Sequence, residues 1–205
     1  MGDEMTDSSM RLAVVGSGYV GLTTGVALAF LGHHVVCVDK DPNKLSLLRD
    51  GICPIHEPGL VTMMRCAWTR MSFSSQLGDE VSGAEVIFIA VGTPSCSDGS
   101  ADTGYVEEAA REIALAMRDG RSYTIVVKST VPLGCNRRVV HVIQQTLLQR
   151  KCHAVVHVVS NPEFLSEAQA LRDFLYPDRI VVGSSSPEGI EVLRRMYAPV
   201  LEQTF

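Results

Sequence analysis

The sequence predicts a doubly wound α/β fold, in which helices cover both faces of a mostly parallel sheet within a single domain. Short runs rich in β-branched residues, of the kind that form strands buried on both faces, alternate with helical stretches along the chain. The first run leads into a glycine-rich turn and then a helix. Regular alternation of this kind is typical of βαβ units joined by right-handed crossovers.

The elements can be placed in order along the chain. A strand is expected at 11–15, and the helix that follows at 19–31 is apolar on every side and ends at Gly32, which suits a helix buried between a sheet and a second layer. Further strands are expected at 34–38, 71–73, 85–91, 123–127, 154–159 and 179–183. Further helices are expected at 41–50, 60–70, 105–117, 137–149 and 187–197.

Composition restricts the class of partner. The chain has 205 residues and is 46% hydrophobic, enough for one well-buried domain, which we expect over 11–205 after a polar, disordered tail at 1–10. The net charge is −5 with acids and bases interspersed, so we expect no nucleic acid and no membrane as partner. No apolar run approaches membrane-spanning length. The expected partners are small molecules or proteins.

The six cysteines form no C-x-x-C pair and no zinc-type spacing with histidine, so we expect neither a metal site nor a disulfide framework. Reduced thiols are typical of cytosolic proteins. A cytoplasmic location is therefore expected.

The turn at 16–21 has the G-x-G-x-x-G pattern of a Rossmann-type dinucleotide site. Gly16 permits the tight turn, Gly18 lets the backbone approach the phosphates, and Gly21 lets the helix pack on the strand. The helix N-terminus supplies N–H groups for the pyrophosphate. Asp39 ends the next strand, where a carboxylate can bind the hydroxyls of the adenosine ribose. This pattern favours NAD over NADP.

Other nucleotide sites are less consistent with the pattern. Leu22 stands where a P-loop requires lysine, which excludes that motif. A methyltransferase remains an alternative, because such folds also end the second strand with an acid, although the third glycine argues against it.

Three polar motifs follow predicted strands, at 92–95, 128–132 and 161–164. Proline, serine and threonine commonly end strands and cap helices, so each motif alone has a structural explanation. Together they place small polar groups and one carboxylate at the carboxyl edge of the sheet, where open α/β sheets bind ligands.

Six motifs in this order resemble those of the UDP-glucose/GDP-mannose dehydrogenases. The resemblance covers the amino-terminal half of that family and extends here from Met10 to the end of the chain. The motifs lie at 16–22, 54–60, 91–94, 128–132, 160–165 and 177–179.

The resemblance implies a two-step oxidation. The primary alcohol at C6 of a nucleotide sugar, UDP-glucose first among them, gives hydride to NAD and becomes an aldehyde, and the aldehyde becomes a carboxylate through a thioester. Two NAD are consumed for each UDP-glucuronate formed.

The resemblance also implies roles for individual positions. Catalytic roles fall on Thr130, whose hydroxyl would hold a water, and Glu163, which would exchange protons with the water or the thioester. Both also have structural alternatives, as a cap and as a helix N-terminal acid. The implied cofactor residues are Gly16, Ser17, Gly18, Tyr19, Val20, Gly21, Asp39, Lys44, Val91, Gly92, Thr93, Pro94, Ser95, Ser129, Thr130 and Glu167. The implied substrate residues are Glu163, Phe164, Leu165, Ser166 and Glu167.

Two departures from the family pattern stand out. Ala168 occupies a position where the family commonly has glycine. The sequence also stops at Phe205, near where the family's connecting helix should begin, so we expect this chain alone to lack the nucleophilic cysteine and to be catalytically incomplete. We expect this piece to be a monomer and a full-length form to be a homo-oligomer.

Two other functions remain open. One is a non-catalytic NAD-binding module that pairs with or regulates a full-length enzyme. The other is a different Rossmann dehydrogenase, acting on a hydroxyacyl or sugar-acid substrate.

Overall fold

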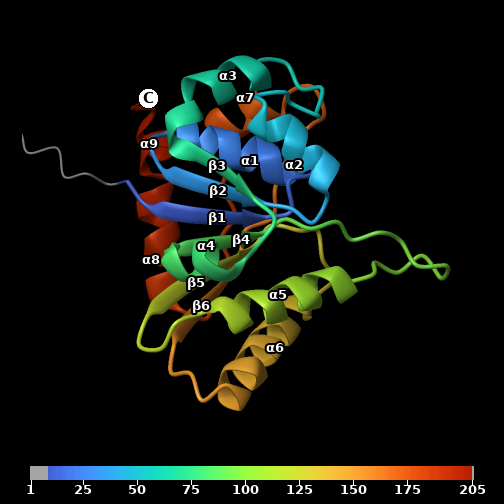
Figure 1. Cartoon of the computed structure of the whole chain (residues 1–205), viewed down its shortest axis with the longest axis vertical. Helices are drawn as coiled ribbons and strands as arrows, with labels where there is room; N and C mark the ends of the chain where they lie inside the picture. Colours follow the sequence, from blue (N-terminus) through green and yellow to red (C-terminus); the bar gives the residue numbers. More distant parts are fainter. Residues whose placement is uncertain (1–8, 205) are drawn as a thin grey trace, which may run out of the picture.

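The computed structural model describes residues 9–204 and shows a six-stranded, all-parallel sheet with the order β3-β2-β1-β4-β5-β6 (Figure 1). This order runs outward from β1 in both directions, which confirms the predicted doubly wound sheet. The direction reverses between β1 and β4, the switch point at which such sheets bind ligands. The strands are β1 (Arg11–Val15), β2 (His34–Val38), β3 (Met71–Ser74), β4 (Val86–Ile89), β5 (Ser122–Val127) and β6 (Val155–Ser160).

Helices connect the strands and cover the sheet. The described residues form α1 (Tyr19–Phe30), α2 (Pro42–Arg49), α3 (Leu60–Cys66), α4 (Gly78–Gly83), α5 (Gly104–Ala116), α6 (Cys135–Gln149), α7 (Ala170–Leu175), α8 (Pro187–Met196) and α9 (Ala198–Glu202). A 3₁₀ turn at Trp68–Arg70 completes the helix predicted over 60–70.

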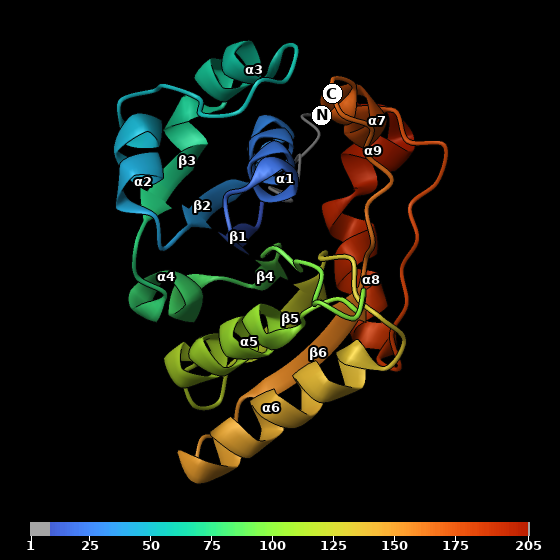
Figure 2. The same cartoon turned by 90° about the vertical axis from the view of Figure 1, so that its right-hand side faces the viewer.

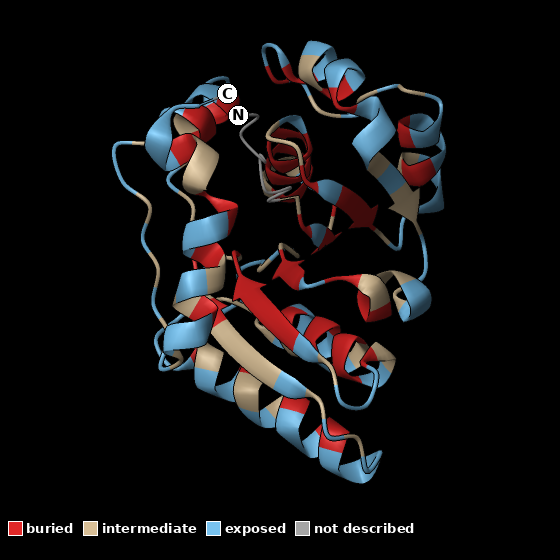
Figure 3. Cartoon of the chain, turned by 90° about the vertical axis from the view of Figure 1, so that its left-hand side faces the viewer, coloured by how far each residue is buried: buried red, intermediate tan, exposed pale blue. Residues whose placement is uncertain are grey.

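Two hydrophobic cores lie on opposite faces of the sheet. Leu12 and Val14 of β1 belong to the core shared with α1, α3, α7 and α8, whereas Ala13 and Val15 belong to the core shared with α4, α5 and α6. Figure 2 shows α5 and α6 on one side of the sheet and α1 and α8 on the other. Burial on both faces explains the uninterrupted apolar runs of the central strands. Figure 3 shows these strands buried and the edge strand β6 less so.

The segment 179–183 does not form the strand predicted for it. It makes one antiparallel bridge, between Ser160 and Gly183, with N–O distances of 2.7 and 2.9 Å. The carbonyl of Val181 accepts a hydrogen bond from the side-chain amide of Asn161 at 2.9 Å. The segment therefore meets the sheet only at the last residue of β6.

Three short helices, α4, α7 and α9, were not predicted, because each is too short for a helical period to stand out in the sequence. Strand β4 ends at Ile89, although strand was predicted up to 91. The N–H of Ala90 still bonds the carbonyl of Val15 at 2.9 Å, and the chain then turns into the switch-point crevice.

The predicted tail at 1–10 lies mostly outside the described residues. Met10, its last residue, is 5% exposed and belongs to the core, which corrects the expectation for that position. The N–H of Met10 donates to Nδ1 of the buried His33 at 3.2 Å. Among residues 9–204, no helix combines the length and the apolar character that crossing a membrane requires.

Candidate functional site

A cleft of about 750 Å³ opens at the switch point, between the glycine-rich turn and α5. Its walls come from the carboxyl ends of β1, β2 and β4, the segment before α4, and one side of α5. The predicted cofactor residues that line it are Gly16, Gly18, Asp39, Lys44, Val91, Gly92 and Pro94.

The three glycines of the turn meet different surroundings. Gly16 has a φ of +96°, and a Cβ there would lie 2.7 Å from the carbonyl oxygen of Ala90. A Cβ on Gly21 would lie 1.8 Å from the carbonyl oxygen of Gly16, so the turn and α1 can pack this closely only without a side chain. A Cβ on Gly18 would meet no atom of residues 9–204 within 4 Å. The cleft is therefore open at the one glycine where a pyrophosphate must approach the backbone.

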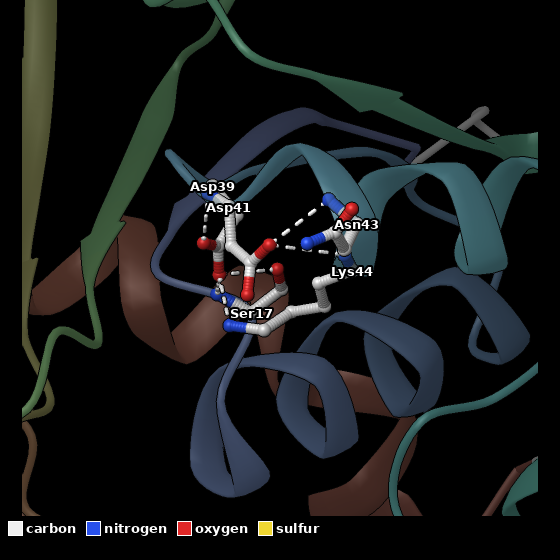
Figure 4. A network of polar contacts seen from close by, with 5 residues as sticks. All are labelled: Ser17, Asp39, Asp41, Asn43 and Lys44. Carbon is white, nitrogen blue, oxygen red and sulfur yellow. Dashed lines mark hydrogen bonds and ion pairs between the residues drawn. The ribbon is translucent and has the colours of Figure 1, made fainter.

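Asp39 is fixed on the glycine turn by a network of hydrogen bonds (Figure 4). Its Oδ2 accepts from the backbone N–H and the hydroxyl of Ser17 at 2.8 and 2.7 Å, and from Nζ of Lys44 at 2.7 Å. Its Oδ1 accepts from the N–H of Asp41 at 3.0 Å. Burial raises the pKa of Asp39, but the bonds from Lys44, Asp41 and Ser17 outweigh burial and lower it to about 2. The carboxylate therefore stays charged.

A second lysine at this end of the cleft is also held by carboxylates. Nζ of Lys40 lies 3.1 Å from Oε1 of Glu108 and 2.9 Å from Oε1 of Glu112, both on α5. Hydrogen bonds to Glu112 and Glu108 raise the pKa of Lys40. Both Lys40 and Lys44 are therefore paired with carboxylates at this end of the cleft.

A second cleft, of about 600 Å³, lies near the carboxyl end of β6 and contains part of the predicted substrate segment. Glu163, Phe164 and Leu165 line it. Oε2 of Glu163 is buried and has no hydrogen-bond partner among residues 9–204. A buried carboxylate oxygen without a partner is costly, so this one is suited to a ligand or a water.

The wall of the second cleft holds a buried polar cluster that the sequence did not predict. Lys128 is 4% exposed, and its Nζ lies 3.4 Å from Oδ1 of Asn161, which also accepts from the hydroxyl of Tyr197 at 2.8 Å. Nζ of Lys128 also lies 5.9 Å from the ring centroid of Phe174. Burial lowers the pKa of Lys128 to about 8, although Glu163 acts in the opposite direction. Lys128 and Asn161 stand in predicted motifs, but no sequence signal links them to Tyr197.

The polar motifs at the ends of β4 and β5 are tied together. The hydroxyl of Ser129 donates to the carbonyl of Val91 at 2.7 Å, and the hydroxyl of Thr93 donates to the carbonyl of Thr130 at 3.0 Å. These bonds give Ser129 and Thr93 roles in holding the edge of the cofactor cleft.

Other predicted residues lie away from both cleft linings. Ser17 is fully buried behind the turn, and Val20 and Gly21 lie in α1. Ser95 bridges to Ala101. Thr130, Ser166 and Glu167 are exposed, so their predicted roles stay predictions. Tyr19 also lies outside both linings, and its hydroxyl contacts other segments.

A doubly wound sheet with a glycine turn at its switch point and a fixed acid at the end of β2 defines the NAD-binding domain of a dehydrogenase. Residues 10–201 match the family model described as the UDP-glucose/GDP-mannose dehydrogenase family, NAD binding domain. The chain belongs to this family, and its cofactor is NAD.

Curated relatives and solved structures agree with this assignment. The chain is 43% identical to the UDP-glucose 6-dehydrogenase of Pseudomonas aeruginosa, over 94% of this chain and 42% of the relative, and 47% identical to that of Rhizobium meliloti, over 93% and 44%. It superposes with a TM-score of 0.90 on a UDP-glucose dehydrogenase from Pyrobaculum islandicum, at 40% identity over 96% of this chain and 45% of that one. The chain thus spans under half the length of each of these three relatives.

Proposed function

We propose that this chain is the NAD-binding part of a UDP-glucose 6-dehydrogenase, which oxidises UDP-glucose to UDP-glucuronate with two NAD as hydride acceptors. The observation that carries the proposal is the junction of the glycine turn with the segment 161–169. The N–H of Ala168, in that segment, donates to the hydroxyl of Tyr19, in the turn, at 3.0 Å. Relatives at 43–47% identity bear the name UDP-glucose 6-dehydrogenase, which favours this sugar nucleotide.

The residues of the first cleft fit the cofactor. The open space at Gly18 would admit the pyrophosphate, and Asp39 would bind the adenosine ribose. NAD, when bound, supplies the carbon that accepts hydride from the alcohol.

On the sugar side, this chain supplies acid–base groups and polar contacts. Oε2 of Glu163 is buried and has no hydrogen-bond partner within residues 9–204, which supports a role for this carboxylate in taking a proton from, or returning one to, a water near the sugar carbon. We propose that the hydroxyl of Thr130 holds that water. Phe164, Leu165, Ser166 and Glu167 would border the sugar.

Location and assembly are part of the same proposal. All six cysteines are free in the structure, as in a reducing cytoplasm. We propose that a full-length, homo-oligomeric enzyme makes further contacts near α9, where Leu201 is 58% exposed.

Calorimetric titration of the 205-residue chain with NAD and NADP tests the cofactor site. A second assay follows NADH absorbance with UDP-glucose, using the chain alone and the chain joined to the remaining half of a family enzyme. We expect NAD binding by the chain and turnover only in the joined form, where the sugar is enclosed. Binding without turnover in the joined form would favour the non-catalytic module. Absence of NAD binding would refute the proposal.

A further inference from the structure

Three segments that are distant in the sequence meet at the side chains of Tyr19 and Glu57. Tyr19 is the first residue of α1, directly after Gly18. Its hydroxyl donates to Oε2 of Glu57 and accepts from the N–H of Ala168. Oε1 of Glu57 accepts from the N–H of Leu171 at 3.3 Å. The motif at 54–60, which the cofactor and sugar sites do not use, is thereby joined to both.

Glu57 is an unusual residue to bury. It is 6% exposed, and acids are almost never so deeply buried unless they are paired. Both of its oxygens have donors, the Tyr19 hydroxyl and the Leu171 N–H. Burial, followed by the hydrogen bond to Glu57, raises the pKa of Tyr19, so its hydroxyl keeps the proton that it donates. The pair is therefore a fixed, fully bonded link.

The segment at the far end of the link is held in a conformation that needs support. Ala168 has a φ of +66°, in the left-handed region that disfavours residues with a Cβ. Its N–H is bonded to Tyr19, and the adjacent Gln169 bonds the carbonyl of Ser166 at 3.0 Å. The N–H of Ser166 donates to the carboxylate of Asp173 on α7 at 2.8 Å. Through Ala168, Tyr19 thus sets the path of the chain that carries Glu163 and Glu167.

We propose that Tyr19 and Glu57 are positioning residues that couple NAD binding at the glycine turn to the order of segment 163–171. Tyr19 adjoins the position of the pyrophosphate on one side and holds Ala168 on the other, so a ligand that fixes the start of α1 also fixes this segment. Coupling between two ligands is reciprocal. A ligand that binds segment 163–171 therefore raises the affinity for NAD by the same factor by which NAD raises the affinity for that ligand. The sugar-binding role of the segment rests on the proposed function.

Amide hydrogen exchange of the 205-residue chain, with and without saturating NAD, tests the coupling directly. In the wild type we expect NAD to slow exchange across 163–171 by about tenfold, the effect of a coupling of about 1.4 kcal/mol. Tyr19→Phe removes the hydroxyl that Ala168 and Glu57 share. We expect that saturating NAD no longer slows exchange across the segment in this variant.

A matched control separates positioning from general stability. Ile143 lies in the core on the opposite face of the sheet, away from Tyr19 and Glu57. Ile143→Val should lower the stability of the chain without changing the contacts of these two residues. In this variant, NAD should slow amide exchange across 163–171 by the same factor as in the wild type. If Tyr19→Phe does not fold, Glu57→Gln replaces it, because an amide cannot reproduce both charge-assisted bonds; we expect the slowing to shrink at least threefold.

The outcomes distinguish this inference from the proposed function. If the wild type binds NAD but segment 163–171 exchanges at the same rate with and without it, the coupling is refuted and the NAD site stands. If NAD still slows exchange across 163–171 to the full extent in Tyr19→Phe, or in Glu57→Gln where that variant replaces it, the coupling does not pass through Tyr19 and Glu57. A wild type that binds no NAD overturns the proposed function and this inference together.

Discussion

Lys44 and Asp39 form an ion pair of 2.7 Å in the wall of the cofactor cleft, through the same carboxylate oxygen that accepts both hydrogen bonds from Ser17. The lysine side chain is 27% exposed and the aspartate side chain 11%, so solvent screens this pair only in part. The carboxylate that would bind the ribose is therefore locked to the phosphate turn before any ligand arrives.

The first prediction concerns cofactor preference. The chain should bind NAD more tightly than NADP, because Asp39 repels a 2′-phosphate while Glu108 and Glu112 engage Lys40. Glu108→Gln combined with Glu112→Gln should release Lys40 and narrow the preference about fivefold, since an exposed ion pair contributes up to about 1 kcal/mol. Calorimetric titration with both cofactors measures the ratio.

Glu107→Gln is the matched control, because Glu107 lies on the same helix but pairs with Arg138, at 2.9 Å. It should leave the ratio unchanged. Equal or tighter binding of NADP by the wild type would contradict the role given to Asp39.

The second prediction separates two glycines of one turn. Gly18→Val should fold normally, because a Cβ there meets no atom of the described residues within 4 Å, yet it should abolish NAD binding by filling the space of the pyrophosphate. Gly21→Ala should destabilise the chain by about 1–3 kcal/mol, because its Cβ would overlap the carbonyl oxygen of Gly16. Thermal unfolding without ligand and calorimetry with NAD give the two readouts. Similar melting temperatures for the two variants would count against this account of the turn.

The third prediction is a pH dependence of stability. The folded-state pKa of Lys128 is about 8, below the value of about 10.4 for an unfolded lysine. Between these values the unfolded chain binds the additional proton, so Lys128 makes stability rise with pH, by at most about 1.4 kcal/mol per unit. Below about pH 8 the burial cost is present in full.

Lys128→Met removes this contribution. Urea unfolding of both proteins from about pH 7 to 10 should give stability curves that converge or cross as the pH rises. Curves that stay parallel over that range would show that Lys128 titrates normally in the folded protein.

The fourth prediction concerns Glu163. In the chain joined to the remaining half of a family enzyme, Glu163→Gln should lower the rate of NADH formation by roughly 100-fold, as expected for loss of a positioned acid–base group. NAD affinity, measured in the same protein, serves as the control and should not change. A wild-type rate in this variant would assign Glu163 a structural role.

Much of the fold could be predicted because the central strands β1, β2, β4 and β5 are buried on both faces. Continuous runs rich in β-branched residues mark these central strands, and all six strands lie at or near the positions predicted for them. The segment 179–183 is also rich in β-branched residues, so a strand was predicted there. In the structure the carbonyl of Val181 instead accepts a hydrogen bond from the side-chain amide of Asn161. No local pattern reveals that competition.

Part of the candidate site could likewise be predicted from the sequence, and part could not. The cofactor cleft could be predicted because its glycines and Asp39 lie in one βαβ unit with a recognised spacing. The buried cluster of Lys128, Asn161 and Tyr197 could not, because its members come from three separate segments and meet only through tertiary packing.

The central place of β1 sets an order of assembly. In the sheet, β1 lies between β2 and β4. Strand β2 follows β1 closely in the sequence, whereas β4 is synthesised only after β3 and α4. During synthesis the first βαβ unit can pair on one side alone, and its other edge stays open until Val86–Ile89 leaves the ribosome. An unpaired edge of this kind invites pairing with another chain. Until the switch point closes, the growing polypeptide therefore exposes a strand edge that can pair with another chain.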